Sequence, residues 1–144
     1  MGLDCYIVHG NDRSKDFTAE DEPRIKDVNL CGGMMSGHGA DGSFRGKWYE
    51  PLIDELLETD YLWHIEGENA HITAQQLKEQ AEALADLLHS VESDAKHLEQ
   101  TLEPETIVYK TDRMEAEYTY QEIQDLELLL RCASERGAVM VCWW

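Results

Sequence analysis

Basic residues are scarce in this sequence of 144 residues, which has 12 Lys and Arg against 30 Asp and Glu and a formal net charge of −18. A surface with this excess of carboxylates repels the phosphates of nucleic acids and of anionic membranes. The composition therefore argues against direct binding to nucleic acid or to a membrane. It favours a partner that carries positive charge.

Long apolar runs are also missing. No stretch approaches the ~18–20 apolar residues that cross a bilayer. The opening MGLDCYIVHG has no basic segment followed by a long apolar one. We therefore expect no membrane span and no signal peptide, and we expect a cytoplasmic protein.

Cysteine is sparse and irregularly spaced, at positions Cys5, Cys31, Cys132 and Cys142. The sequence has no CxxC pair, and no histidine stands at zinc-finger spacing from these residues. HExxH and EF-hand patterns are absent as well. We expect reduced thiols, as in other cytoplasmic proteins. The sequence predicts no metal site, no cofactor and no catalytic residue, and it favours a binding protein over an enzyme.

Short apolar segments predict strands at both ends of the chain. Residues 3–8 alternate between two faces, and residues 138–144 are apolar on both faces, which is typical of a central strand. Short strands are predicted at 25–31 and 61–65, and residues 105–110 are predicted as a further strand or as an extended connection between two helices. A short helix is predicted at 51–58, with helical turns beginning before Pro51.

A long helix is predicted in the middle of the chain. Thr73 and Gln76 match a capping box at its start, and Pro104 stands after its end. Between them, apolar residues recur at alternating spacings of four and three, which predicts one helix over 73–102. The residues of this seam are Leu77, Ala81, Leu84, Leu88, Val91, Ala95, Leu98 and Leu102.

A second helix is predicted between a capping box at Thr119 and Glu122 and a C-terminal cap at Gly137. Together these elements predict one α+β domain, residues 1–144. In this fold class a small sheet that includes the N- and C-terminal strands is packed by a long antiparallel helix pair. The seam also leaves open a homodimer through the helix 73–102, with the two copies antiparallel because acidic residues flank the seam.

Six glycines crowd residues 32–46, and residues 37–42 read GHGADG, which matches G-x-G-x-x-G. Glycine lets backbone N–H groups approach a phosphate, and nearby cations help to hold it. Residues 32–47 are therefore one of two candidate sites, and they would bind a small ligand, a phosphate or an enzyme's substrate. This site is the alternative to the acidic surface described next. Its predicted ligand-binding residues are His38, Ser43, Arg45 and Lys47. A dinucleotide-binding fold is disfavoured because strands and helices do not alternate. The stretch 31–53 resembles small bacterial proteins, a resemblance that implies no particular activity.

The negative charge is concentrated in the middle of the chain. Residues 51–100 contain 12 acidic and 2 basic residues. Carboxylates on a rigid helix can imitate phosphates and speed association with a basic protein partner. We therefore predict a small acidic interaction protein, such as an inhibitor, an immunity or antitoxin-like protein or a nucleic-acid mimic. Its predicted partner-binding acidic face consists of Glu79, Glu82, Asp86, Glu92, Asp94 and Glu99.

Overall fold

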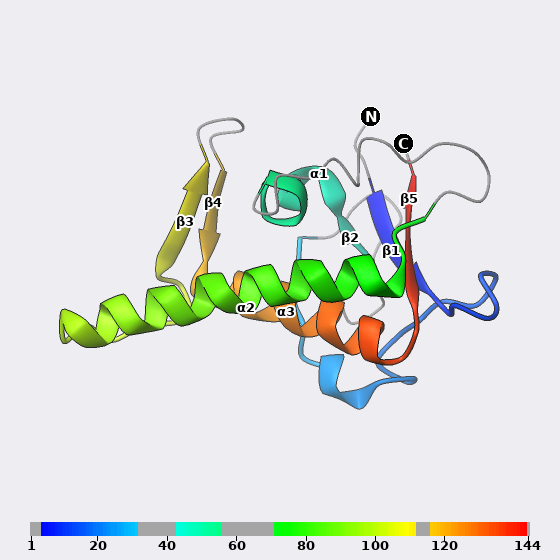
Figure 1. Cartoon of the computed structure of the whole chain (residues 1–144), viewed down its shortest axis with the longest axis horizontal. Coiled ribbons are helices and arrows are strands. Elements are labelled where there is room, and N and C mark those ends of the chain that lie inside the picture. The colour runs from blue at the N-terminus through cyan, green and yellow to red at the C-terminus, as the bar shows by residue number, and fades with distance from the viewer. Residues whose placement is uncertain (1–3, 32–42, 56–70, 112–115, 144) are drawn as a thin grey trace.

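The two ends of the chain meet in one antiparallel sheet. The computed structural model describes residues 4–31, 43–55, 71–111 and 116–143. Strand β1 (Asp4–Val8) lies between β2 (Ser43–Arg45) and β5 (Val139–Trp143) in the order β2-β1-β5. The predicted sharing of a sheet by the terminal strands is confirmed (Figure 1).

The predicted central position of the last strand is wrong, because β1 occupies the centre and β5 the edge of the described sheet. The apolar character of β5 has another source. Met140 is fully buried in the core and forms an isolated bridge with Ile72, just before the long helix. An edge strand covered in this way needs apolar residues as much as a central strand does.

Two helices form the body of the protein, α2 (Ala74–His97) and α3 (Tyr120–Glu135). Both predicted capping boxes are present. Thr73 accepts a hydrogen bond from the Gln76 N–H, and Thr119 accepts one from the Glu122 N–H. In each box the Gln or Glu side chain bonds back to the N–H of the threonine, so that two otherwise unpaired donors are satisfied.

Helix α2 is shorter than predicted and ends at His97, not at residue 102. Glu99 has a φ of 56°, the left-handed region, and its N–H donates to the Lys96 carbonyl. The Gln100 N–H donates to the Ala95 carbonyl at 2.7 Å. These two bonds form a Schellman motif, which stops a helix and reverses the chain. The sequence did not predict this stop because the left-handed residue is not glycine.

Helix α3 ends with the same motif, in this case at the predicted cap Gly137, whose φ is 69°. The Gly137 N–H donates to the Ser134 carbonyl, and the Ala138 N–H donates to the Ala133 carbonyl. The reversal leads directly into β5 and so joins the helix pair to the sheet. The left-handed backbone conformation therefore carries no strain at Gly137, whereas it is strained at Glu99 because glutamate has a Cβ atom.

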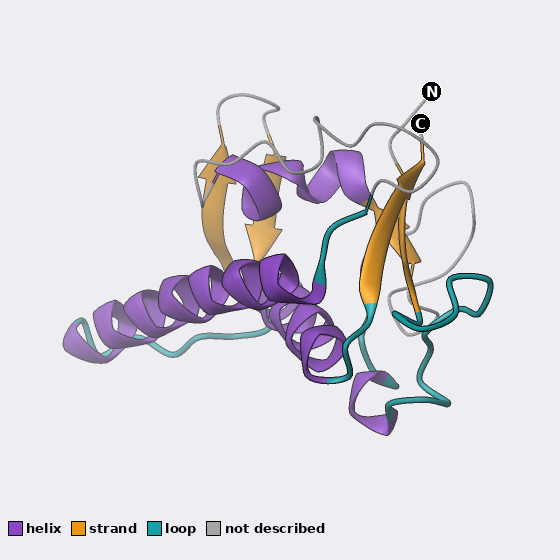
Figure 2. Cartoon of the chain, turned by 45° about the vertical axis from the view of Figure 1, so that its right-hand side comes forward, coloured by secondary structure: helices purple, strands orange, loops and turns teal. Residues whose placement is uncertain are grey.

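The helices run in opposite directions and pack on each other beside the sheet (Figures 1 and 2). The predicted α+β fold with an antiparallel helix pair is confirmed. The first half of the seam is buried together with one face of α3. The buried residues shared by this interface and the core are Leu77, Ala81, Leu84, Leu88, Ile123, Leu126, Leu129, Leu130 and Ala133.

A second, two-stranded sheet stands apart from the first and is held by aromatic rings. It pairs β3 (Ile107–Thr111) with β4 (Ala116–Thr119). The fully buried Tyr118 ring contacts Trp48, Tyr49 and Tyr109, with ring centroids 5.8 to 6.1 Å apart. The strand predicted at 105–110 is thus present, while its β4 partner was not predicted.

The remaining short predictions have mixed outcomes. Helical turns begin before Pro51, as α1 (Gly46–Glu50) followed by the short π-helix η2 (Pro51–Glu55). The strand predicted at 25–31 is wrong, because its first residue ends the 3-10 helix η1 (Pro23–Ile25) and the following residues join no sheet within the described structure. Val28 and Leu30 are apolar because they are buried in the core. The strand predicted at 61–65 lies outside the described residues.

The two helix stops predict opposite effects of substitution. Glu99→Gly should stabilise the protein by about 1 kcal/mol, because glycine adopts the left-handed conformation without strain. Gly137→Ala should destabilise it by about 1–2 kcal/mol, and this cost is purely a backbone cost because an added Cβ meets no atom within 4 Å. Urea denaturation midpoints measure both effects. A midpoint lowered by Glu99→Gly would contradict the strain at this turn.

Candidate functional site

The described residues that flank the glycine-rich segment are held together by hydrogen bonds. The Arg45 N–H donates to the Cys31 carbonyl at 2.8 Å. The Tyr49 hydroxyl accepts from the Cys31 N–H at 2.8 Å and donates to Glu122 Oε2 at 2.9 Å. Burial raises the pKa of Tyr49, so the hydroxyl keeps its proton. The flanks of residues 32–42 are therefore fixed beside the start of α3.

The four ligand residues predicted around this segment are only partly described. Ser43 and Arg45 lie two residues apart on β2, with Ser43 buried and Arg45 half-buried. Because side chains alternate along a strand, they share one face of β2. His38 and the side chain of Lys47 lie outside the described residues. The ligand site on 32–47 stays a prediction.

The six predicted acidic residues occupy α2 and the turn after it: Glu79, Glu82, Asp86, Glu92 and Asp94 on the helix and Glu99 at its reversal. At 3.6 residues per turn, Glu79, Glu82 and Asp86 fall on one stripe, opposite the buried leucines. We call these three residues the outer stripe. Glu92 lies on a different side of α2, where it accepts a hydrogen bond from the Tyr120 hydroxyl. This bond raises the pKa of Tyr120 to about 12.

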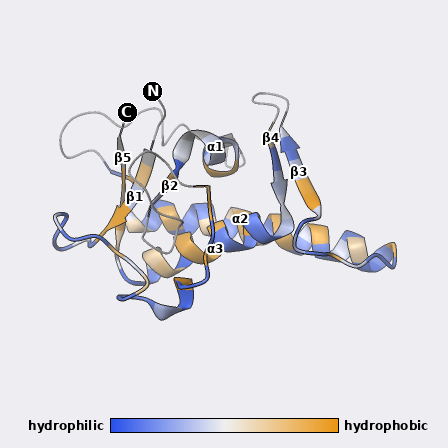
Figure 3. Cartoon of the chain, turned by 180° about the vertical axis from the view of Figure 1, so that it is seen from behind, coloured by the Kyte–Doolittle hydropathy of each residue, from blue (hydrophilic) through white to orange (hydrophobic). Residues whose placement is uncertain are grey.

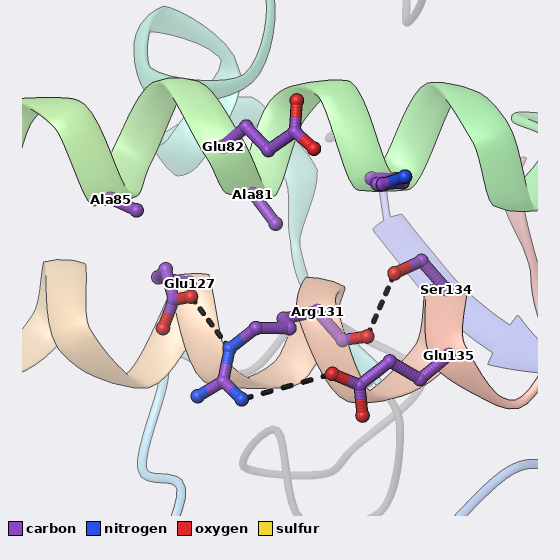
Figure 4. A pocket seen from close by; sticks show the side chains of 8 residues that line it. Ala81, Glu82, Ala85, Glu127, Arg131, Ser134 and Glu135 are labelled. Carbon is purple, nitrogen blue, oxygen red and sulfur yellow. Dashed lines mark hydrogen bonds and ion pairs between the residues drawn. The ribbon is translucent and has the colours of Figure 1, made fainter.

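A groove of about 420 Å³ runs between α2 and α3 beside the outer stripe. Figure 4 shows Ala81 and Ala85 on the α2 wall and Arg131 on the α3 wall. Arg131 Nε donates to Glu127 at 2.8 Å, and Glu135 lies 3.9 Å from its other end. The Arg131 guanidinium is therefore already neutralised from both sides. Lys78 also lines the groove, where it is exposed and forms no ion pair within the described structure.

Several carboxylates elsewhere on the described body have cationic partners. Glu22 is buried and is held by Arg24 at 3.0 Å and by Arg136 at 3.1 Å. Glu117 pairs with Lys110 at 3.3 Å. By contrast, no cation of the described chain lies at ion-pair distance from the three exposed carboxylates Glu82, Asp86 and Asp94. These three carboxylates of α2 are therefore uncompensated within the described structure.

This arrangement suits recognition of cations. Exposed carboxylates accept hydrogen bonds from ammonium and guanidinium groups. Within residues 4–31, 43–55, 71–111 and 116–143, no cluster of three or more His, Cys, Asp or Glu could hold a metal ion. No helix in these ranges is both long enough and apolar enough to cross a membrane.

Sequence reasoning missed the α3 wall of the groove. Glu127, Arg131 and Glu135 stand at successive spacings of four, which is the spacing of ion pairs along one face of a helix. That pattern was a usable signal for a charged, exposed stripe on α3. Its position beside α2 was not predictable, because the angle between the two helices depends on how their side chains interlock.

Tyr49→Phe should destabilise the protein by about 1–3 kcal/mol, because the Cys31 N–H and the Glu122 carboxylate lose their partner at a buried position. Thermal unfolding of the two proteins measures the difference. Tyr6→Phe is the control, since it makes the same change on a half-buried ring of β1. Equal stability of Tyr49→Phe and the wild type would show that this hydroxyl does not anchor Cys31.

Stability should depend on pH through Glu22. Hydrogen bonds from Arg24 and then Arg136 lower the pKa of Glu22 from 4.5 to about 2 in the folded protein. A lowered pKa means that Glu22 stabilises the fold above about pH 4.5 and that this contribution is lost as the pH falls towards 2. Glu22→Gln should therefore lower the melting temperature at neutral pH, and the gap to the wild type should close in acid. Glu20→Gln, in the same loop but exposed, should show no such gap. A gap that is constant with pH would contradict the ion-pair assignment.

Comparison of the chain with protein-family models, with curated proteins and with solved structures finds no match. No residue therefore takes a role from a relative. The candidate site consists of the outer stripe, the groove beside it and the unpaired carboxylates along α2.

Proposed function

We propose that this is a small acidic interaction protein that binds a basic protein partner through the exposed carboxylates of α2. An inhibitor, an immunity or antitoxin-like protein and a nucleic-acid mimic all act in this way. The bacterial source and cytoplasmic location expected from the sequence belong to the same proposal. A homodimer through the helix 73–102 stays a separate prediction.

The observation that carries the proposal is the uneven pairing of carboxylates. Cations neutralise Glu22, Glu127 and Glu117, whereas among the described residues Glu82 and Asp86 are exposed and have no cation at ion-pair distance. Like charges placed four residues apart on a helix destabilise it by a few tenths of a kcal/mol. A cationic partner would remove this repulsion.

The outer stripe also has a suitable geometry. Residues four apart on a helix are displaced by about 6 Å along its axis, so the carboxylates form a row of regularly spaced anions. The opposite face of α2 is buried against α3, which keeps the row in place. A fixed row of charges steers a basic protein into contact and costs little reorganisation on binding.

The alternative function, binding of a small ligand or phosphate by residues 32–47, has one supporting observation. The Arg45 N–H donates to the Cys31 carbonyl, so the described flanks of this segment meet. A loop closed at its base is a suitable frame for a binding site.

The test uses a labelled lysine-only peptide as a defined basic probe, with binding followed by fluorescence anisotropy. Raising the salt concentration from about 20 to about 200 mM should weaken binding on the order of tenfold, because exposed charges are screened. The double variant Glu82→Gln with Asp86→Asn should bind several-fold more weakly than the wild type. The control Glu20→Gln with Asp27→Asn removes the same charge elsewhere on the exposed surface. Equal loss in both variants would mean that only net charge matters and would overturn the proposed face.

A further inference from the structure

The far end of α2 forms a second groove with the chain that follows it. In Figure 1 the last turns of α2 extend past the β3–β4 hairpin, and the chain then turns back along the helix to β3. The groove measures about 200 Å³. We call it the far-end groove, and it is lined by Val91, Asp94, Ala95, Leu98, Gln100, Leu102, Thr106, Ile107 and Val108.

The far-end groove gathers large exposed hydrophobic side chains of the described structure. Among the described residues, the large hydrophobic side chains that are exposed are Leu98, at 62%, and Ile107, at 40%. Both line this one groove. Figure 3 shows the hydrophobic start of β3 next to the mixed hydrophobic and hydrophilic end of α2. Single exposed hydrophobic residues are ordinary, but two that share a groove mark a contact surface.

The chain that forms the far-end groove is acidic. Asp94 lines the groove, and residues 91–108 also contain Glu92, Glu99, Glu103 and Glu105 against a single Lys or Arg, Lys96. All five carboxylates, which we call the rim, are exposed and have no cation at ion-pair distance within the described structure. A second copy of the chain would bring the same negative rim against this one, which disfavours self-association here. The charge instead complements a cationic occupant.

The size of the groove indicates side chains of a larger partner. Pockets for small molecules usually measure about 300–1,000 Å³, more than the far-end groove provides. An amphipathic helix places apolar residues three and four apart on one face and basic residues on its flanks. Its apolar face would cover Leu98 and Ile107 while its flanks meet Asp94, Glu99 and Glu103.

We propose that the far-end groove binds an amphipathic basic helix of the partner. This inference rests on the proposed function, since it names the element of the basic partner that α2 recognises. The outer stripe and the rim attract the positive charge, and the groove takes the apolar side chains. Leu98 and Ile107 are the residues that distinguish such a helix from any other cationic chain.

The experiment uses two labelled peptides of identical Leu, Lys and Ala composition. One places its leucines on a single helical stripe, and the other has a scrambled order without a stripe. We expect the wild type to bind the striped peptide on the order of tenfold more tightly. The double variant Leu98→Ser with Ile107→Thr should lose this preference and keep its melting temperature, because both side chains are exposed. The control Ala85→Ser, in the groove between α2 and α3, should retain the preference.

The outcomes separate the two proposals. Equal binding of both peptides, with weaker binding by the Glu82→Gln and Asp86→Asn variant, would overturn the far-end groove and leave the proposed function standing. If neither of these peptides binds and the lysine-only peptide does not bind either, both proposals would be overturned. Light scattering of the wild type and of the Leu98→Ser with Ile107→Thr variant tests a second copy as the occupant. A dimer that this variant abolishes would also overturn the proposal.

Discussion

The packing of α2 on α3 is the interaction on which the rest of this structure depends. Leu84 of α2 and Leu126 and Leu130 of α3 are fully buried, and replacing one such leucine by alanine typically costs about 2–5 kcal/mol. The start of α2 leads from the Ile72–Met140 bridge, and the end of α3 leads into β5. The helix pair therefore positions the sheet at one end and leaves the outer face of α2 in solvent.

Some carboxylates of the described body support the fold through ion pairs, whereas Glu82 and Asp86 of α2 do not. Pairing Glu22 with Arg24 and Arg136 ties the loop before η1 to the end of α3, so that charge supports the fold there. Ion pairs between two exposed side chains contribute little to stability, whereas a buried carboxylate such as Glu22 would destabilise the fold without its cations. Glu82 and Asp86 carry no such structural duty among the described contacts. Their charge is available to a partner without loss of stability.

Features that depend on local sequence were predictable, and features that depend on tertiary contacts were not. The capping boxes at Thr73 and Thr119 and the stop at Gly137 each follow from residues within one turn. The stop at Glu99 was missed because a non-glycine residue adopts the left-handed conformation there. The seam predicted the buried face of α2 correctly up to Leu88 and again at Ala95. At Leu98 the same spacing leads to an exposed side chain, because the helix ends at His97 while the repeat continues.

The acidic residues and the far-end groove act on different steps of association. Exposed charges chiefly raise the rate of encounter and make it sensitive to salt. Apolar side chains that enter a groove chiefly lengthen the lifetime of the complex. Because Asp94 lines the far-end groove together with Leu98, a basic helix held by this carboxylate would arrive with its apolar face beside the groove. Charge alone would accept any cationic chain, so the specificity of recognition would depend on the two exposed hydrophobic residues.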